Sequence, residues 1–176
     1  MIEQSVKDLW SLHAQGFYAL DPTNLTLDAA GHAVMGAGIS AVVRARWPEA
    51  PVRLGSWIAA YTSPGATPGR SLKAAECLGR LVFLDRAARL VYLPTKYYWR
   101  DGADLTLIKR GLAELAALLR AHSELRVALP RLGAGLGGLD WEGVVEPVVV
   151  AALDRPEFAG RVLLAAPRAK SGPILS

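Results

Sequence analysis

The sequence contains a single cysteine, Cys77, among 176 residues. One cysteine excludes an intramolecular disulfide framework, so we expect a reducing compartment and a buried, inert thiol. No apolar run approaches the roughly 20 residues that a membrane span needs. The start, Met1-Ile2-Glu3-Gln4, also lacks the basic and apolar pattern of a signal peptide. We therefore expect a cytoplasmic protein that makes no membrane contact.

Histidines are few, and the common catalytic signatures are missing. His13, His32 and His122 are isolated from one another, and no pair has the spacing of metal ligands. The sequence therefore predicts no metal site and no cofactor. It also contains no Gly-x-Ser-x-Gly elbow and no His-Glu-x-x-His motif, which argues against an esterase-type serine nucleophile and a zinc protease.

Charge is modest, whereas apolar residues are plentiful. The net charge of +4 permits an anionic ligand or nucleic acid, but the arginines are scattered and form no obvious nucleic-acid patch. Hydrophobic residues make up 52% of the chain and charged residues 20%, as is typical of a packed globular domain. We expect residues 1–168 to form one domain and residues 169–176 a frayed tail.

The most distinctive stretch is a glycine loop, with four glycines in the six residues from Gly133 to Gly138. It follows an apolar run, 125–129, that predicts a buried strand, and it precedes a helical pattern over 141–153 that Pro147 should kink or restart. Glycine lets backbone N–H groups approach a ligand, and a helix N-terminus attracts an anion. The loop lacks the Lys-Ser/Thr ending of a P-loop and the context of a dinucleotide fingerprint. We interpret it as a site for a phosphate-bearing ligand rather than as a simple tight turn.

A second glycine turn, Gly36-Ala37-Gly38, leads into an apolar-periodic segment that Pro48 ends. Two such turns suggest two loops that close on one phosphate-rich ligand. A tight entry into the helix is the alternative for this turn taken alone.

The remaining segments alternate between strand and helix patterns. The expected elements are a strand over 16–20 ended by a turn at 21–24, a strand or helix over 54–61, a surface loop over 63–69, a hairpin from 81–84 and 90–93, a helix from Leu105 capped by Asp101 or Asp104, and a last strand over 161–166. This order predicts an α/β fold whose mixed, mostly parallel sheet is covered on both faces.

The segment from Pro94 to Arg100 places Lys96, Arg100 and three aromatic residues after a strand. One interpretation is a cation with a stacking surface for a nucleotide. The other is a packing corner with solvated cationic side chains. The residues alone leave both open.

Four motifs occur in an order that resembles a known family. They are Pro22-Thr23-Asn24, Val34-Met35-Gly36-Ala37-Gly38-Ile39, Pro94-Thr95-Lys96-x-x-Trp99-Arg100 and Pro130-Arg131-Leu132-Gly133-x-Gly135-x-Gly137-Gly138-Leu139-Asp140-Trp141-Glu142. From about Asp8 to Pro147 the chain is similar to the macrodomain family, which binds ADP-ribose. The branch it resembles most is that of the DNA ADP-ribosyl glycohydrolase antitoxins, the terminal ADP-ribose glycohydrolases and their phage-type relatives.

The resemblance implies a three-layer α/β/α fold with ADP-ribose, or an ADP-ribosylated macromolecule, in a cleft at the strand ends. It implies that Asp8 and Leu9 meet the adenine and that Asn24 lies near the distal ribose as the candidate catalytic residue. The other implied ligand-binding residues are Met35, Gly36, Ala37, Gly38, Ile39, Thr95, Arg131, Gly133, Ala134, Gly135, Leu136, Gly137 and Gly138.

Two positions depart from the hydrolytic pattern that the resemblance implies. A lysine expected in the helix after the first glycine turn is replaced by Arg44, or by Ala45 in a shifted alignment, and an aspartate of the second loop by Gly137. Arginine stays protonated and cannot act as an amine nucleophile. Three hypotheses follow: a binding module for ADP-ribose, a hydrolase that removes it from nucleic acid or protein, and an interaction domain with a degenerate cleft. The replaced lysine favours binding.

Overall fold

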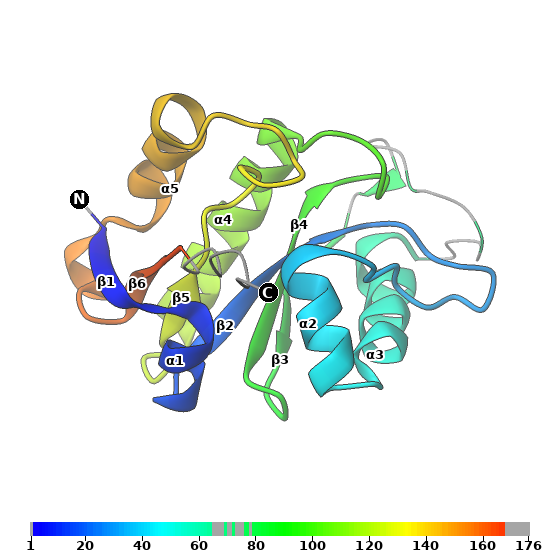
Figure 1. The fold of residues 1–176 in the computed structure, drawn as a ribbon, viewed down its shortest axis with the longest axis horizontal. Helices are drawn as coiled ribbons and strands as arrows, with labels where there is room; N and C mark the ends of the chain where they lie inside the picture. The colour runs from blue at the N-terminus through cyan, green and yellow to red at the C-terminus, as the bar shows by residue number, and fades with distance from the viewer. Residues whose placement is uncertain (1, 65–68, 70–71, 73–75, 78, 168–176) are drawn as a thin grey trace, which may run out of the picture.

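A six-stranded sheet forms the middle of the molecule (Figure 1). The computed structural model describes residues 2–64, 69, 72, 76–77 and 79–167. The strands are β1 (Glu3–Asp8), β2 (Tyr18–Asn24), β3 (Phe83–Asp85), β4 (Leu90–Lys96), β5 (Val127–Leu129) and β6 (Val162–Ala166). They lie in the order β1-β6-β5-β2-β4-β3, and every neighbouring pair is parallel except β3 and β4.

Helices cover both faces of this sheet. The helices α4 (Leu105–Ala121) and α5 (Glu146–Leu153) pack on one face, and α1 (Leu9–Ala14), α2 (Gly38–Arg46) and α3 (Ala50–Trp57) pack on the other. Successive side chains of a strand point to opposite faces. In β4, Leu90 and Tyr92 therefore join the cluster under α2 and α3, whereas Val91 and Leu93 join the cluster under α4. The predicted three-layer α/β/α fold with a mostly parallel sheet is confirmed.

Most local predictions hold. The helix after the first glycine turn is α2, the hairpin is β3 and β4, and the carboxylate of Asp104 caps α4 by accepting from the N–H of Leu107 at 2.8 Å. The ambiguous segment 54–61 is helical, since α3 continues into a π-helical turn, η1 (Ile58–Thr62). Pro147 does restart its helix: a π-helical turn, η3 (Trp141–Val145), precedes α5.

The turn predicted at 21–24 is wrong, because β2 continues through these residues to Asn24. Proline has no N–H for a sheet ladder and is tolerated where one side of the strand is unpaired. On its β5 side, β2 pairs only through Tyr18 and Ala19, so Pro22 lies beyond the last β5 partner. The two strands part at this point, and the cleft described below opens from the same end of the sheet.

The edge strand β1 is the element that sequence patterns miss. Its side chains are exposed or half-buried, and they show no alternation of apolar and polar residues. An exposed edge strand gains little from burial, so its sequence carries no period-2 signal.

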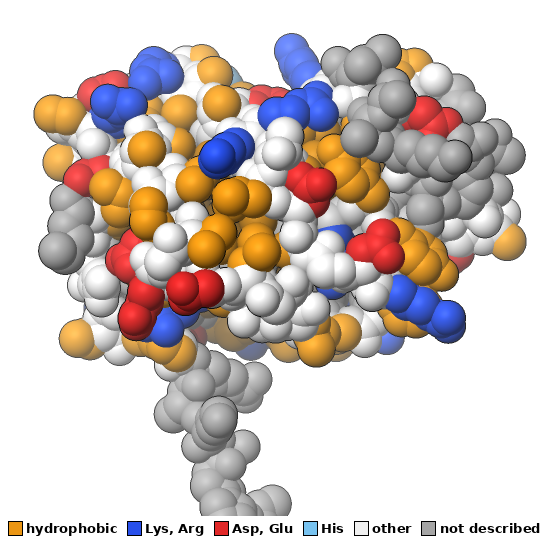
Figure 2. Space-filling view, turned by 90° about the horizontal axis from the view of Figure 1, so that it is seen from above, with side chains coloured by type: hydrophobic (Ala, Val, Ile, Leu, Met, Phe, Trp, Pro, Cys, Tyr) orange, Lys and Arg blue, Asp and Glu red, His pale blue; other side chains and the backbone are white. Residues whose placement is uncertain are grey.

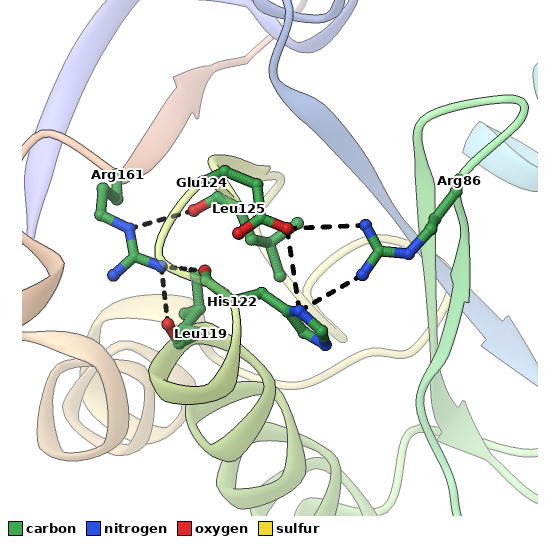
Figure 3. A network of polar contacts seen from close by, with 6 residues as sticks. All are labelled: Arg86, Leu119, His122, Glu124, Leu125 and Arg161. Carbon is green, nitrogen blue, oxygen red and sulfur yellow. Dashed lines mark hydrogen bonds and ion pairs between the residues drawn. The ribbon is translucent and has the colours of Figure 1, made fainter.

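The C-terminal end of α4 is held by Arg161, the residue before β6 (Figure 3). Its Nη2 donates to the carbonyl oxygens of Leu119 and His122, each at 2.6 Å, and its Nε donates to the carbonyl of Leu125 at 3.1 Å. The last carbonyls of a helix lack intrahelical partners. One guanidinium therefore satisfies them and ties α4 to β5 and β6.

Some expectations concern residues outside the described part. The surface loop over 63–69 lies largely there, and so does the tail over 169–176. Cys77 is buried, and burial raises the pKa of its thiol to about 11, so this thiol stays protonated at neutral pH. Within the described residues, no helix combines the length and apolarity that crossing a bilayer requires.

Candidate functional site

The two glycine turns meet at one cavity at the carboxyl ends of the strands. This cavity, of about 450 Å³, is lined by Gly36 from the first turn and Gly135 from the second, which are 99 positions apart in the chain. Asn24 at the end of β2 and Lys96 at the end of β4 line it as well. We call it the distal cavity. Ligands of open α/β sheets bind at this end of the strands.

A larger cavity, of about 780 Å³, continues the cleft toward α1. We call it the proximal cavity. Gly38, Ile39 and Arg131 line both cavities, so the start of α2 and Arg131, which precedes the second glycine loop, lie at the boundary between them. Asp8 and Leu9 lie in the proximal cavity. The cleft therefore runs from the distal cavity, which both turns line, past the start of α2 to the proximal cavity.

The charge of the distal cavity suits an anion. Among the described residues that line it, Lys96 and Arg131 are cationic and none is acidic. The helix α2 begins here, and no side chain caps its first turn. The first N–H groups of a helix lack intrahelical partners and carry the positive end of the helix dipole. Figure 2 views the molecule from the side on which the parallel strands end, where hydrophobic side chains lie among side chains of both charges.

The second loop is held by its own backbone. Gly138 donates to the carbonyl of Gly135 at 3.1 Å, and Leu139 donates to that of Gly133 at 3.0 Å. The N–H of Ala103 donates to the carbonyl of Gly137 at 2.9 Å, which ties the loop to the segment before α4. These bonds fix the loop shape, so its cleft-facing backbone is already ordered.

Asn24 has a structural task besides its place in the cavity. Its Oδ1 accepts from the N–H of Thr26 at 2.9 Å, and its Nδ2 donates to the carbonyl of Val34 at 2.8 Å. These bonds draw residues 26–34 against the end of β2 and position the first glycine turn. Asn24 retains one N–H and one lone pair that can face the cavity.

Asp8 likewise serves the fold. Its Oδ1 accepts from the N–H groups of Trp10 and Ser11, both at 2.9 Å, and so caps α1. A carboxylate at this position is favoured by the helix dipole. The same cap holds Leu9 and Trp10 at the wall of the proximal cavity.

Most of the predicted ligand-binding residues line the cleft, but three do not. Met35 is only 2% exposed and packs in the core under α2, and neither Ala134 nor Gly138 lines either cavity. Thr95 lines the distal cavity, and its hydroxyl donates to the carbonyl of Thr23 at 3.3 Å. Arg44 and Ala45, which stand at the expected lysine, are exposed and line neither cavity.

Lys96, for which the sequence left a nucleotide-binding cation and a solvated packing corner both open, lines the distal cavity. Its Nζ donates to the carbonyl of Asp101 at 2.7 Å, which bends the side chain back over the turn after β4. As the last residue of β4, Lys96 lies at the carboxyl end of a parallel strand, where ligands of open α/β sheets bind.

Trp10 is not among the ligand-binding residues expected from the sequence. It lines the proximal cavity, and the guanidinium of Arg46 lies over its ring, with Cζ 4.3 Å from the centroid. Trp47 packs behind it at 6.2 Å between ring centroids. The proximal cavity thus has an aromatic wall that faces a cation.

Beneath α2 lies a buried carboxyl group that the sequence did not indicate. Asp21 of β2 is fully buried, and the hydroxyl of Ser40 donates to its Oδ1 at 2.7 Å. Its Oδ2 has no hydrogen-bond partner among the residues that the structure describes. Burial raises the pKa of Asp21 to about 7, although the bond from Ser40 opposes this shift.

Comparison with known proteins adds independent information. No family model matches the chain. A curated relative from Mycobacterium tuberculosis, named DNA ADP-ribosyl glycohydrolase, is 32% identical over 130 residues, or 70% of this chain. The chain spans about a third of the length of that relative.

Two solved structures agree with this similarity over nearly the whole chain. The macrodomain of Mycobacterium tuberculosis DarG is 28% identical with a TM-score of 0.63, and that of Thermus aquaticus DarG is 25% identical with a TM-score of 0.64. In both comparisons the match covers 95% of this chain and 99% of the solved chain. The fold described above is therefore shared with these domains from end to end.

Proposed function

Because this chain belongs to the macrodomain family, we propose that it binds ADP-ribose in the cleft between the two glycine turns and removes ADP-ribose from ADP-ribosylated DNA. The observation that carries this proposal is the distal cavity. Two backbone turns from distant parts of the chain line it, cationic side chains accompany them, and no described lining residue is acidic.

The shape of the cleft fits the parts of ADP-ribose. A diphosphate at the boundary between the cavities would meet the N-terminus of α2 and Arg131, which suit an anion. The adenosine would then occupy the proximal cavity, beside Asp8 and Trp10. The distal ribose would lie near Asn24 and Lys96.

Lys96 is the candidate for the hydrolytic step. It is the only amine among the described residues that line the two cavities, and it lies at the end where we place the distal ribose. As a neutral amine, Lys96 could attack C1 of the distal ribose, which breaks the bond to the DNA base, and water would then hydrolyse the adduct and release ADP-ribose. As an ammonium group, it could instead stabilise the negative charge that develops on the departing base while water attacks C1. Lys96 would thus take the role that the exposed Arg44 cannot fill.

The first experiment is calorimetry with free ADP-ribose together with an assay of ADP-ribose release from ADP-ribosylated single-stranded DNA. We expect Lys96→Ala to slow release by roughly 100-fold or more while free ADP-ribose still binds within a few-fold of the native affinity. Lys96→Arg separates the two roles: it retains the charge but cannot form a bond to the sugar.

The matched control is Lys109→Ala, which removes an exposed lysine of α4 outside both cavities. Native release rates in Lys96→Ala would refute the assigned role of this amine. Binding of ADP-ribose without any release from DNA would leave the protein a binding module. No heat with millimolar ADP-ribose would leave only an interaction domain with a degenerate cleft.

A further inference from the structure

Two exposed hydrophobic side chains flank the mouth of the distal cavity, and the proposed function does not use them. Trp99 is 44% exposed and Leu136 is 77% exposed, and both line this cavity. The described residues include only five exposed large hydrophobic side chains, and two of them lie together at the rim of this one cavity. An exposed apolar rim beside a ligand cleft is typical of a binding surface.

Trp99 is held in place rather than left on a loose loop. Its N–H donates to the hydroxyl of Thr26 at 3.0 Å, and the N–H of Thr26 in turn donates to Asn24. The next turn is closed by the N–H of Asp101, which donates to the carbonyl of Tyr98 at 3.0 Å. These bonds hold the main chain of Trp99 close to Asn24, the residue that we place beside the distal ribose.

The charges around Trp99 favour a polyanion. The guanidinium of Arg100 lies over the indole, with Cζ 4.6 Å from the ring centroid, and Lys96 and Arg131 line the same cavity. A rigid aromatic face among cationic side chains binds single-stranded nucleic acid, because bases stack on the ring and phosphates pair with the cations.

We propose that Trp99 stacks with a nucleobase of single-stranded DNA, either the ADP-ribosylated base or its neighbour, while Leu136 packs against that base from the other loop. This rests on the proposed function, since the ADP-ribose group places the DNA at the distal mouth. This contact favours substrates whose distal ribose is attached to a nucleobase. Free ADP-ribose carries no base beyond its distal ribose, so it cannot make the stacking contact.

The test compares three ligands: free ADP-ribose, an ADP-ribosylated mononucleoside and an ADP-ribosylated single-stranded octanucleotide. The readouts are Kd for the first and kcat/KM for the other two, or Kd for all three if the protein binds without turnover. If Trp99 stacks with a neighbouring base, the native protein should prefer the octanucleotide over the mononucleoside by about tenfold or more, and Trp99→Ala should abolish this preference. In either case Trp99→Ala should leave the Kd of ADP-ribose within twofold.

A second octanucleotide, with abasic sites beside the modified base, separates the contribution of the neighbouring bases to binding from that of the phosphates. If Trp99 stacks with a neighbour, the native protein should handle this substrate as Trp99→Ala handles the intact one. If Trp99 stacks with the modified base itself, Trp99→Ala should lower kcat/KM for the octanucleotide and for the mononucleoside by the same factor. The Kd of free ADP-ribose should again stay unchanged.

Matched controls come from exposed side chains outside both cavities. Tyr61→Ala removes an aromatic residue that is 51% exposed, and Val52→Ala, at 45% exposed, is the control for Leu136→Ala. If Tyr61→Ala lowered kcat/KM for the octanucleotide as much as Trp99→Ala does, the proposal would be overturned. The proposal would also be overturned if Trp99→Ala weakened the binding of free ADP-ribose as strongly as it lowers kcat/KM for the octanucleotide. An equal decrease for an ADP-ribosylated peptide would overturn it as well. A native protein that fails to bind ADP-ribose would instead overturn the proposed function itself.

Discussion

At the scale of single residues, the glycines of the two turns differ in what a side chain would meet. A Cβ added to Gly36 or Gly135 would meet nothing within 4 Å, and both residues line the distal cavity. A Cβ on Gly137 would lie 2.5 Å from the carbonyl oxygen of Gly133. The first two glycines therefore keep the cleft open, whereas Gly137 allows the second loop to fold on itself.

These positions give a prediction that separates ligand affinity from stability. Gly36→Ala and Gly135→Ala should each weaken ADP-ribose binding by about tenfold, since a methyl group would enter the space of the diphosphate. Because nothing is displaced in the unliganded protein, we expect its melting temperature to change by no more than about 2 °C. Calorimetry and thermal unfolding measure the two effects.

Gly137→Ala is the contrasting variant and should lower the melting temperature even without ligand. If Gly36→Ala and Gly135→Ala bind ADP-ribose as tightly as the native chain, the diphosphate does not pass between the two turns.

The sequence indicated these turns but not every residue around them, for a physical reason. Clustered glycines before a helix form a local sequence pattern, and this pattern alone indicates that backbone N–H groups can come close to a ligand. Asp21, by contrast, precedes a proline and looked like a turn residue, yet it lies in a strand under α2. Burial of one carboxyl depends on which helix covers it, and that contact is not local in the chain.

At the scale of elements, α2 is linked to the sheet by an interaction that depends on pH. Ser40 of α2 donates to Asp21 of β2, whose Oδ2 has no hydrogen-bond partner, and the register places Tyr92 of β4 opposite Asp21. Burial, and then the nearby charge of Asp21, raise the pKa of the Tyr92 phenol. The interior under α2 therefore accommodates a neutral carboxyl better than an ionised one.

The consequence for stability follows from the direction of the Asp21 shift. Its pKa is 3.8 when unperturbed and about 7 in the folded protein, so the folded state binds more protons between these values. The contribution of Asp21 to the free energy of unfolding therefore falls as pH rises from about 4 to 7 and levels off above. Each pKa unit corresponds to about 1.4 kcal/mol.

We expect Asp21→Asn to stabilise the protein relative to the native chain at pH 8 by more than at pH 4.5, as measured by urea unfolding at both pH values. Ser40→Ala, which removes the hydrogen bond and leaves the carboxyl, should retain the pH dependence. A difference between Asp21→Asn and the native chain that stays constant from pH 4.5 to 8 would mean that the carboxyl is not desolvated in solution.

At the scale of the whole molecule, the kinds of element could be predicted but their neighbours could not. The period of apolar residues indicated α4 and the β3–β4 hairpin, because each depends on contacts close in sequence. The order β1-β6-β5-β2-β4-β3 pairs strands from opposite ends of the chain, such as Glu3 with Leu163. Such parallel pairing leaves no mark on either segment alone. The similar patterns of the two glycine turns predicted that they meet, as Gly36 and Gly135 do at one cavity, but the strand order that brings them together required the structure.

That long-range meeting has a direct test in hydrogen exchange. The first turn follows β2, the second follows β5, and these strands pair only through Tyr18 and Ala19. A ligand that spans both turns should slow amide exchange in residues 36–40 and 133–138 together, with one midpoint in an ADP-ribose titration. The outer face of α4, around Lys109, should keep its native exchange rates. Protection of one turn alone would place the ligand on a single loop, because only a molecule that contacts both can couple segments so far apart in the chain.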